Sequence, residues 1–247
     1  MSKTSKLAVV TGASSGIGAA TATALNQAGF ELMLGARREE RLREVAEPLG
    51  AAFQALDVAD PESVEAFCAR LERCDLLVNN AGAAFGLDRI EDARDEDWRA
   101  MYEVNVLGAL RMTRLLLPLL RQAGGQIVNV GSTSGFETYA GGAGYTASKH
   151  ALRALTRTLR LELHGEPVRV CEISPGLVET EFSVVRHRGD SQRAAAVYSG
   201  MTPLTGADVA EAIRWAATRP AHVNVDEIVI RPLDQAHSTL VQRRKAE

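Results

Sequence analysis

Short apolar runs alternate along the chain with longer stretches in which apolar residues recur every three or four positions. The runs typical of strands cover 7–11, 31–35, 52–57, 75–79, 126–131, 168–174 and 227–230. The stretches typical of helices cover 16–29, 39–49, 61–72, 95–122, 146–164 and 207–219. Strands that are apolar almost throughout are typical of a parallel sheet buried on both faces. The alternation therefore predicts an α/β fold, with a doubly wound parallel sheet of seven strands between two layers of helices.

One irregular stretch, 179–206, lies between the sixth strand and the last long helix. We interpret it as an inserted loop, a part of a protein that often carries binding residues. No repeat, linker or low-complexity block divides the remainder, which predicts a single domain over 1–247. The polar tail at 242–247 is expected to be frayed.

The composition excludes several classes of protein. A length of 247 residues, with 46% hydrophobic and 24% charged residues, is ordinary for one large soluble domain. The net charge of −3 gives no general attraction to nucleic acid or to an anionic membrane. The most leucine-rich stretch, 110–120, contains two arginines and a proline, so we expect no membrane span.

The cysteines indicate a reducing compartment. Cys68, Cys74 and Cys171 are too few and too irregularly spaced for a disulfide framework or a zinc site. We expect buried, reduced thiols in a cytoplasmic protein, and the first residues lack the apolar run of a signal peptide. No clustered set of metal-ligand residue types is present in the sequence, so no metal is expected.

The first strand runs directly into a glycine-rich turn and then into an apolar helix. The turn reads Thr11-Gly12-Ala13-Ser14-Ser15-Gly16-Ile17-Gly18. Glycines let the backbone approach a pyrophosphate, and the helix N-terminus adds free amides and a partial positive charge. A glycine-rich turn also occurs as an ordinary tight turn, but its place at the first strand–helix junction favours nucleotide binding.

The end of the second strand indicates which nucleotide is bound. An NAD site needs a carboxylate there, whereas an NADP site needs cations for the 2′-phosphate. The chain has Arg37 and Arg38, about 20 residues beyond the glycines. We expect Arg37 to bind the 2′-phosphate with help from the Ser14 hydroxyl. Arg38 is either a second phosphate ligand or a solvated residue at the start of an exposed helix.

Polar and small residues follow the third and fourth strands. Asp57 and Val58 end the third strand, and the fourth ends in Asn79-Asn80-Ala81-Gly82. Ligands of open α/β sheets bind at the carboxyl edge, so both groups are expected to line the nucleotide site. Asp57 could accept a hydrogen bond from an adenine amino group, or it could only shape the turn, because Asp60 already caps the next helix.

A second set of residues indicates proton chemistry. Tyr145 and Lys149 are four positions apart in a predicted helix, so they share one face. A nearby ammonium stabilises phenolate and makes tyrosine usable as a general acid or base. Ser132 directly follows the fifth strand, and its hydroxyl could hold the substrate oxygen. The spacing alone usually means an exposed pair, but its combination with Ser132 and the glycine turn favours catalysis.

These motifs together resemble the short-chain dehydrogenase/reductase family, in order and spacing and over nearly the whole chain. The matching residues are Thr11-Gly12-(x)3-Gly16-x-Gly18, Asn79-Asn80-Ala81-Gly82, Asn105, Ser132, Tyr145-(x)3-Lys149 and Pro175-Gly176. The resemblance implies a Rossmann-type fold and an oxidoreductase that transfers hydride between NADP(H) and a hydroxyl or carbonyl substrate.

The resemblance also implies individual roles. Tyr145 would be the acid/base, Ser132 would polarise the carbonyl, and Lys149 would bind the nicotinamide ribose and lower the pKa of the tyrosine. Asn105 would hold a water that links Lys149 to solvent. Further cofactor contacts at the nicotinamide carboxamide are expected from Pro175, Gly176, Leu177, Val178 and Thr180. The family usually assembles as tetramers through the helices predicted at 95–122 and 146–164, so the resemblance implies a homotetramer, with a dimer as the alternative.

A narrower resemblance is to bacterial NADP-dependent 3-hydroxy acid dehydrogenases, which oxidise serine and allo-threonine. It is carried by the stretches 131–135, 139–142, 181–186 and 220–225. The loop at 179–206 supplies Arg186 and Arg188 for a substrate carboxylate, unless these are solvated residues of a mobile loop. His187 departs from that group, which tends to have an aromatic residue there.

Two other functions remain open. The segment 228–235 also resembles ketone reductases of antibiotic pathways, which implies a neutral ketone or a biosynthetic intermediate as substrate. A non-catalytic NADPH-binding sensor is a third possibility. The complete set of Asn105, Ser132, Tyr145 and Lys149 argues against a sensor, since a sensor needs no acid or base.

Overall fold

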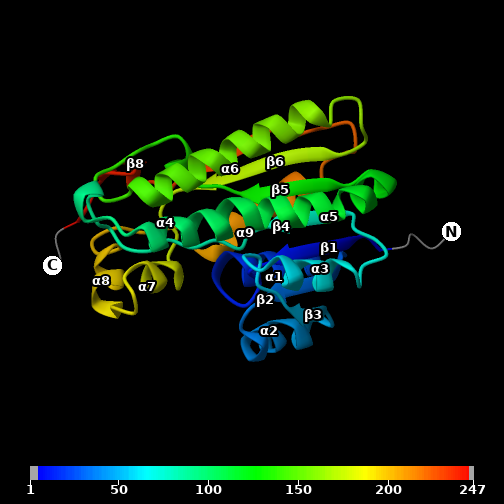
Figure 1. Cartoon of the computed structure of the whole chain (residues 1–247), viewed down its shortest axis with the longest axis horizontal. Coiled ribbons are helices and arrows are strands. Elements are labelled where there is room, and N and C mark those ends of the chain that lie inside the picture. Colours follow the sequence, from blue (N-terminus) through cyan, green and yellow to red (C-terminus); the bar gives the residue numbers. More distant parts are fainter. Residues whose placement is uncertain (1–4, 245–247) are drawn as a thin grey trace.

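Seven parallel strands form one sheet in the computed structural model, which describes residues 5–244 (Figure 1). Their order across the sheet is β3-β2-β1-β4-β5-β6-β7. The strands are β1 Leu7–Thr11, β2 Glu31–Ala36, β3 Ala52–Ala55, β4 Leu76–Asn79, β5 Gln126–Val130, β6 Arg169–Pro175 and β7 Glu227–Ile230. The predicted Rossmann-type, doubly wound sheet is confirmed. The strand order reverses between β1 and β4, where sheets of this kind bind ligands beyond the strand ends.

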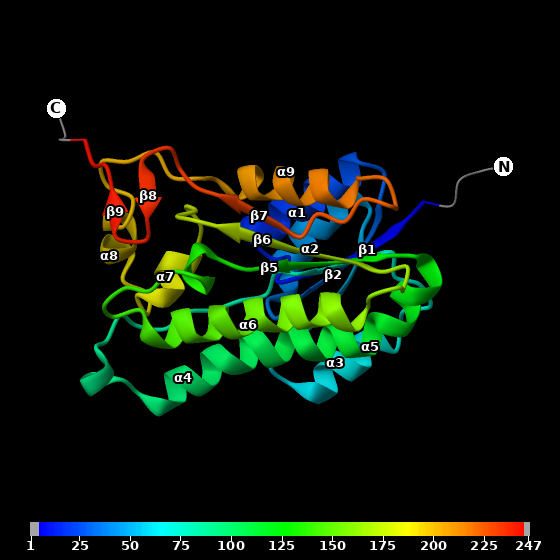
Figure 2. The same ribbon diagram turned by 90° about the horizontal axis from the view of Figure 1, so that it is seen from above.

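Nine α-helices surround the sheet within the described residues. They are α1 Gly16–Gln27, α2 Glu39–Ala46, α3 Pro61–Cys68, α4 Asp95–Tyr102, α5 Gly108–Ala123, α6 Ala143–Glu162, α7 Phe182–Arg186, α8 Ser191–Ala196 and α9 Gly206–Ala217. Figure 2 shows α1 and α9 on one face of the sheet and α3, α5 and α6 on the other. This is the predicted three-layer arrangement.

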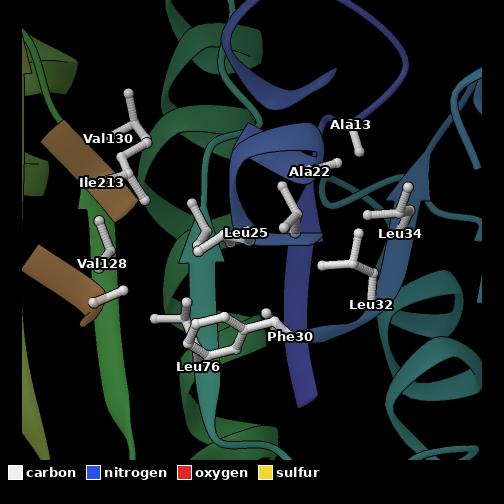
Figure 3. Close-up of a cluster of buried hydrophobic side chains, with 14 of the residues drawn as sticks. Ala13, Ala22, Leu25, Phe30, Leu32, Leu34, Leu76, Val128, Val130 and Ile213 are labelled. Carbon is white, nitrogen blue, oxygen red and sulfur yellow. The ribbon is translucent and has the colours of Figure 1, made fainter. Parts of the chain in front are cut away.

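Side chains on the strands alternate between the two cores. On β1, Ala8 and Val10 belong to the core under α1, α2 and α9, whereas Val9 belongs to the core under α3 and α5. Figure 3 shows the first of these cores, where Leu25 of α1 and Ile213 of α9 lie over the central strands. Both side chains are fully buried. The apolar strands are thus covered on both faces, as their composition predicts.

The three cysteines are buried and unpaired. Cys68 ends α3, Cys74 precedes β4 and Cys171 lies in β6. Burial raises the pKa of each thiol to about 12. Within residues 5–244, no group of His, Cys, Asp or Glu side chains is arranged to hold a metal ion. None of the described helices has the length and apolar character needed to cross a membrane.

The helix predicted at 95–122 is interrupted. A π-helical turn, Glu103–Leu107, separates α4 from α5 and carries the buried Asn105. The wider turn coincides with an amide that bonds to the backbone of a neighbouring loop, and such bulges are often found at functional sites.

The predicted loop at 179–206 contains two short helices, α7 and α8, and Val178 pairs with Leu204 in an isolated parallel bridge. A small hairpin that the sequence pattern did not predict follows the sheet, with strands β8 Gln235–His237 and β9 Leu240–Val241. Figures 1 and 2 show these elements gathered at the end of the molecule opposite the N-terminus.

The predicted fraying of the tail is wrong for residues 242–244. The Gln242 amide donates to the Asp234 carbonyl oxygen (2.8 Å), and the Arg244 amide donates to the Gly200 carbonyl oxygen (2.7 Å). Arg244 also pairs with the Asp234 carboxylate at 3.0 Å. The hairpin brings the end of the described chain back against residues 200 and 234, where the amides of Gln242 and Arg244 find hydrogen-bond partners. Residues 245–247 lie outside the described part of the chain.

Candidate active site

A cleft of about 560 Å³ runs along the carboxyl edge of the sheet, between the ends of the central strands and α7. Most of the predicted site residues line it. From the predicted cofactor site these are Gly12, Ser14, Ser15, Gly16, Ile17, Arg37, Arg38, Asp57, Val58, Asn80, Ala81, Gly82, Tyr145, Lys149, Pro175, Gly176, Leu177, Val178 and Thr180. From the reacting end they are Ser132 and Arg186, together with the tyrosine and lysine already named.

Four predicted residues do not line the cleft. Gly18 lies behind it, where a Cβ would stand 2.3 Å from the Gly12 carbonyl oxygen, so only glycine permits this close packing of helix on strand. The Asn79 amide is buried and donates to Thr113 Oγ1 and Asn129 Oδ1. Asn105 and Arg188 are the other two, and their contacts are described below.

The glycine-rich turn presents free backbone amides to the cleft. Gly12 has a φ of +66°, in the left-handed region, and a Cβ there would stand 2.9 Å from the Ala81 Cα. Ser15 precedes the first residue of α1, and its side chain makes no capping hydrogen bond. The first-turn amides of α1 are therefore available to an anion such as a pyrophosphate.

Thr11 fixes this turn to the end of β4. Its hydroxyl oxygen accepts hydrogen bonds from the amides of Asn80 (3.1 Å) and Ala81 (3.0 Å). In return, Asn80 Nδ2 donates to the carbonyl oxygens of Thr11 (2.9 Å) and Gly12 (3.2 Å). The two loops that form the floor of the cleft are thus held together on both sides of the point where the strand order reverses.

The two arginines after β2 differ in their surroundings. Arg38 donates to the Ser15 hydroxyl at 2.8 Å and to the Ser14 hydroxyl at 3.4 Å, and it pairs with Glu181 at 2.8 Å. Arg37 is exposed, as Arg38 is, and lines the same cleft, but within residues 5–244 its side chain forms no hydrogen bond or ion pair. The sequence favoured Arg37 as the phosphate ligand, whereas the arginine that contacts the glycine-rich turn is Arg38.

Asp57 shapes the turn after β3, and its contact with an adenine amino group stays a prediction. Its Oδ1 accepts the Ala59 amide at 3.0 Å, which shapes the turn, and its own amide donates to Ser63 Oγ. The residue still lines the cleft at the end of β3. Asp60, as expected, caps α3 through the Glu62 amide.

Tyr145 and Ser132 meet at the reacting end. Tyr145 lies in the first turn of α6, and Ser132 directly follows β5. Burial raises the pKa of the Tyr145 phenol to about 12, and the neighbouring Ser132 hydroxyl and the charge of Arg186 oppose this effect. The phenol therefore holds its proton at neutral pH and can donate it to a substrate oxygen.

Lys149 is buried one turn further along α6. Its ammonium donates to the Val130 carbonyl oxygen at 2.9 Å and lies 5.9 Å from the centroid of the Tyr145 ring. Burial lowers the pKa of Lys149 to about 8, while the negative charge of Glu172 acts in the opposite direction. That Lys149 lowers the pKa of the tyrosine stays a prediction.

Glu172 was not predicted from the sequence as a site residue. It lies within the apolar run of β6, is 2% exposed, and accepts a hydrogen bond from the Ser174 hydroxyl at 2.8 Å. Burial raises the pKa of this carboxyl group. A glutamate at the centre of a buried strand was the available signal, because such a residue needs a partner in the fold.

Asn105 connects the π turn to the loop after β4. Its Nδ2 donates to the Ala83 carbonyl oxygen (2.8 Å) and to the Ser148 hydroxyl (2.9 Å), and its Oδ1 accepts the Ala83 amide (2.8 Å). Ser148 precedes Lys149 in α6, so Asn105 lies beside this helix. The water-mediated link to Lys149 stays a prediction.

The two arginines of the predicted substrate loop are separated. Arg186, at the end of α7, has its guanidinium 5.4 Å from the centroids of both Tyr145 and Tyr139 and donates to the Tyr139 hydroxyl at 2.9 Å. Arg188 points to α4 instead, where it pairs with Asp97 at 2.6 Å. His187 between them also lines the cleft.

The far end of the cleft is closed by the C-terminal hairpin, which contributes Gln235 and Ser238. Gln235 is buried, and its Oε1 accepts the Leu177 amide at 2.8 Å. The sequence pattern did not indicate these residues, because strands of two or three residues are too short to show an alternating pattern.

Comparison with known proteins identifies the family. The family model described as short chain dehydrogenase matches residues 6–190. The chain belongs to the short-chain dehydrogenase family. An uncharacterized oxidoreductase from Mycobacterium tuberculosis is 58% identical to this dehydrogenase over 235 residues, which cover 95% of the chain and 94% of the relative. An NADP-dependent 3-hydroxy acid dehydrogenase from Escherichia coli is 40% identical over 97% of the chain and 100% of its own length.

Among solved structures, the closed form of a serine dehydrogenase complexed with NADP⁺ superposes with a TM-score of 0.91. It is 40% identical, and the match covers 97% of this dehydrogenase and 100% of the other chain. The similarity therefore extends through the loop at 179–206 and the C-terminal hairpin, beyond the region matched by the family model.

Proposed function

We propose that the chain is an NADP-dependent oxidoreductase acting on CH–OH groups, and that its substrate is a small 3-hydroxy acid such as serine or allo-threonine. The observation that carries the substrate class is the position of Arg186, an arginine in the cleft beside Tyr145. The printed names of the 3-hydroxy acid and serine dehydrogenases described above support the same class.

The cofactor is NADP. The cleft fits it: the uncapped N-terminus of α1 suits the pyrophosphate, and Arg37 and Arg38 suit a 2′-phosphate. No carboxylate directly follows β2, where an NAD-selecting site would have one. When bound, NADP supplies the hydride donor or acceptor.

The protein supplies the proton chemistry. During reduction, Tyr145 donates its proton to the substrate oxygen while Ser132 hydrogen-bonds to the same atom and stabilises its developing charge. During oxidation, the tyrosine oxygen takes the proton of the substrate hydroxyl. Lys149 holds the ribose and supplies positive charge beside the phenol, and Asn105 supports this end of α6. The same groups argue against a sensor that only binds NADPH.

Arg186 is the side chain proposed to bind the substrate carboxylate. Its partners are the neutral Tyr139 hydroxyl and Gly86 carbonyl oxygen, and it forms no ion pair with any residue of the described chain. A partly buried guanidinium without a counter-ion is suited to an anionic ligand. Arg188, which the sequence also suggested, already has the carboxylate of Asp97.

The test is NADP⁺ reduction with L-serine, L-allo-threonine and 3-hydroxybutyrate, beside neutral secondary alcohols. We expect a preference for the hydroxy acids. Arg186→Gln should raise KM for the acids about tenfold or more, as expected for a lost charge-assisted hydrogen bond. Turnover of neutral alcohols by the same variant provides the internal control, and Arg188→Gln provides the matched surface control. Activity confined to neutral alcohols would contradict the carboxylate assignment.

A second candidate, reduction of a neutral ketone, has one observation in its favour. The cleft wall near α7 is apolar, with Leu87, Phe182, Val185 and Val197 among the lining residues. A bulky neutral substrate would bury more of this wall than serine would. The same set of substrates separates the two proposals.

The location and assembly belong to the proposal as well. We place the enzyme in the cytoplasm, supported by its buried, unpaired thiols. We propose a homotetramer formed through the helices around α4, α5 and α6. Trp98, Tyr102, Leu110 and Leu161 are exposed on these helices, which is consistent with an apolar face that a partner subunit covers.

A further inference from the structure

Glu181 joins the loop at 179–206 to the arginines after β2. This carboxylate directly precedes α7 and forms ion pairs with Arg38, at 2.8 Å, and with Arg41 on α2. The three side chains are about half exposed. Residues more than 100 positions apart in the sequence are thereby connected across the mouth of the cofactor cleft.

The same arginine is part of the proposed phosphate site. Arg38 also donates to the Ser14 and Ser15 hydroxyls, at the N-terminus of α1. Glu181 itself lines the cleft. The Glu181 carboxylate is thus paired with Arg38, an arginine expected to bind the 2′-phosphate. Arg37 has no carboxylate partner within the described residues.

We propose that Glu181 competes with the 2′-phosphate of NADP for Arg38 and Arg41, and so tunes the affinity for the phosphorylated cofactor. This inference rests on the proposed NADP site. When the phosphate binds, it replaces the carboxylate, because two anions cannot share the same guanidinium groups without repulsion. Glu181 then leaves Arg38, and the beginning of α7 is released from α2.

The residues beside Glu181 connect this exchange to the reacting end. Thr180 packs against Gly16 in the glycine-rich turn, with its Cβ 3.2 Å from where a Cβ on that glycine would stand. Phe182, on the other side, contacts the Tyr145 ring with centroids 5.5 Å apart. Glu181 therefore lies between a contact with the cofactor turn and a contact with the catalytic tyrosine, at the start of the helix that carries Arg186.

The expected effect is moderate. Exposed ion pairs contribute up to about 1 kcal/mol, so removing the competing carboxylate should tighten binding of the phosphate by about two- to fivefold. The effect should shrink in high salt, which screens exposed charges.

The experiment measures binding of two probes by calorimetry, without catalysis. 2′,5′-ADP carries the phosphate in question, and 5′-AMP lacks it. We expect Glu181→Gln to bind 2′,5′-ADP about two- to fivefold more tightly than the wild type, with 5′-AMP affinity unchanged. Glu39→Gln is the matched control, because it removes an exposed carboxylate of α2 that pairs with Arg43 instead of Arg38.

Three outcomes would count against the proposal. An unchanged or weaker affinity of Glu181→Gln for 2′,5′-ADP would overturn it and leave the NADP site intact. An equal gain in Glu39→Gln would reduce the effect to net charge and overturn it as well. If the wild type itself bound 2′,5′-ADP no better than 5′-AMP, the NADP site and this inference would both be wrong.

Discussion

Burial changes the pKa values of Tyr145 and Lys149 in opposite directions, because it disfavours the charged form of each. The pKa of the phenol rises to about 12, and the pKa of the ammonium falls to about 8. Tyr145 is therefore protonated at neutral pH and ready to act as an acid. To act as a base it must first lose that proton, so the two directions of the reaction require opposite protonation states.

We expect the two directions to differ in their pH dependence. The small ionised fraction of Tyr145 increases with pH below its raised pKa, so oxidation of the alcohol should accelerate from about pH 6 towards about pH 9. Reduction should change little over this range, because the phenol stays protonated well below a pKa of about 12. Initial rates in both directions, in one buffer series with the cofactor saturating, would measure this. An oxidation rate highest below about pH 7 would contradict the assignment of Tyr145 as the base.

Glu172 should affect this profile through Lys149. Its negative charge raises the pKa of the lysine, so Glu172→Gln should lower that pKa below about 8. The ammonium would then be lost at a lower pH, and the alkaline limit of the oxidation profile should move in the acid direction. Glu172→Asp should restore part of the profile, because it returns the carboxylate. The measurement is the pH dependence of kcat.

Glu227→Gln is the matched control for this variant. Glu227 is the register partner of Glu172 on β7, and its carboxylate pairs with Arg153 at 2.5 Å. Glu172, and not Glu227, is the charge that raises the pKa of Lys149. Glu227 acts one step further away, because its charge raises the pKa of Glu172. Equal profiles for the two glutamine variants would show that Glu172 has only a packing role.

At the scale of elements, the strands and most helices could be predicted because their burial is visible in the sequence. The π turn could not. It depends on hydrogen bonds between Asn105 and Ala83. These two residues are 22 positions apart, so the sequence around either one does not indicate the turn. The third strand ends at Ala55, earlier than predicted, because Asp57 uses its side chain to form a turn.

The Glu137 carboxylate connects the C-terminal hairpin to the loop after β5. Glu137, in the loop after β5, is the partner of Arg231 (2.6 Å), and it accepts hydrogen bonds from the Ser238 amide (2.8 Å) and hydroxyl (2.6 Å). Its side chain is 10% exposed, and the arginine and serine bonds hold its pKa below the usual range although burial acts against this. The hairpin in turn carries Gln235 into the cleft.

Glu137→Ala should therefore loosen the hairpin and weaken substrate binding. Loss of these charged hydrogen bonds should lower the free energy of unfolding by about 1–3 kcal/mol. Amide exchange should accelerate in 235–241, and KM should rise more than kcat falls. Hydrogen–deuterium exchange and chemical denaturation measure the two effects. Glu91→Ala, which removes the exposed partner of Arg89, should change neither.

At the scale of the whole molecule, the part of the candidate site that could be predicted consists of residues directly following the parallel strands. Parallel strands bring their carboxyl ends to one edge, so Gly12, Asn80 and Ser132 were certain to lie close together once the sheet was recognised. The loop at 179–206 offered no such constraint. Whether Arg186 or Arg188 faces the cleft depends on the backbone of one turn, where Arg188 has a φ of +55°.

Assembly is the remaining prediction at this scale. We expect a tetramer in solution, measured by sedimentation or by light scattering after gel filtration. Leu161→Asp, at the most exposed apolar position of α6, should weaken it because a charge would be buried in the contact. A monomer in the wild type at micromolar concentration would contradict the prediction.

The burial of all three cysteines gives the protein a practical property. Thiols with pKa values of about 12, in residues that are at most 8% exposed, are expected to react very slowly with maleimides or with Ellman's reagent at neutral pH. Thiol-reactive labels are therefore expected to leave the three native cysteines unmodified. Leu233 is fully exposed beside the hairpin, so a cysteine introduced at this position would be the thiol that such reagents label. A fluorophore attached there could report on changes around the hairpin when the cofactor binds.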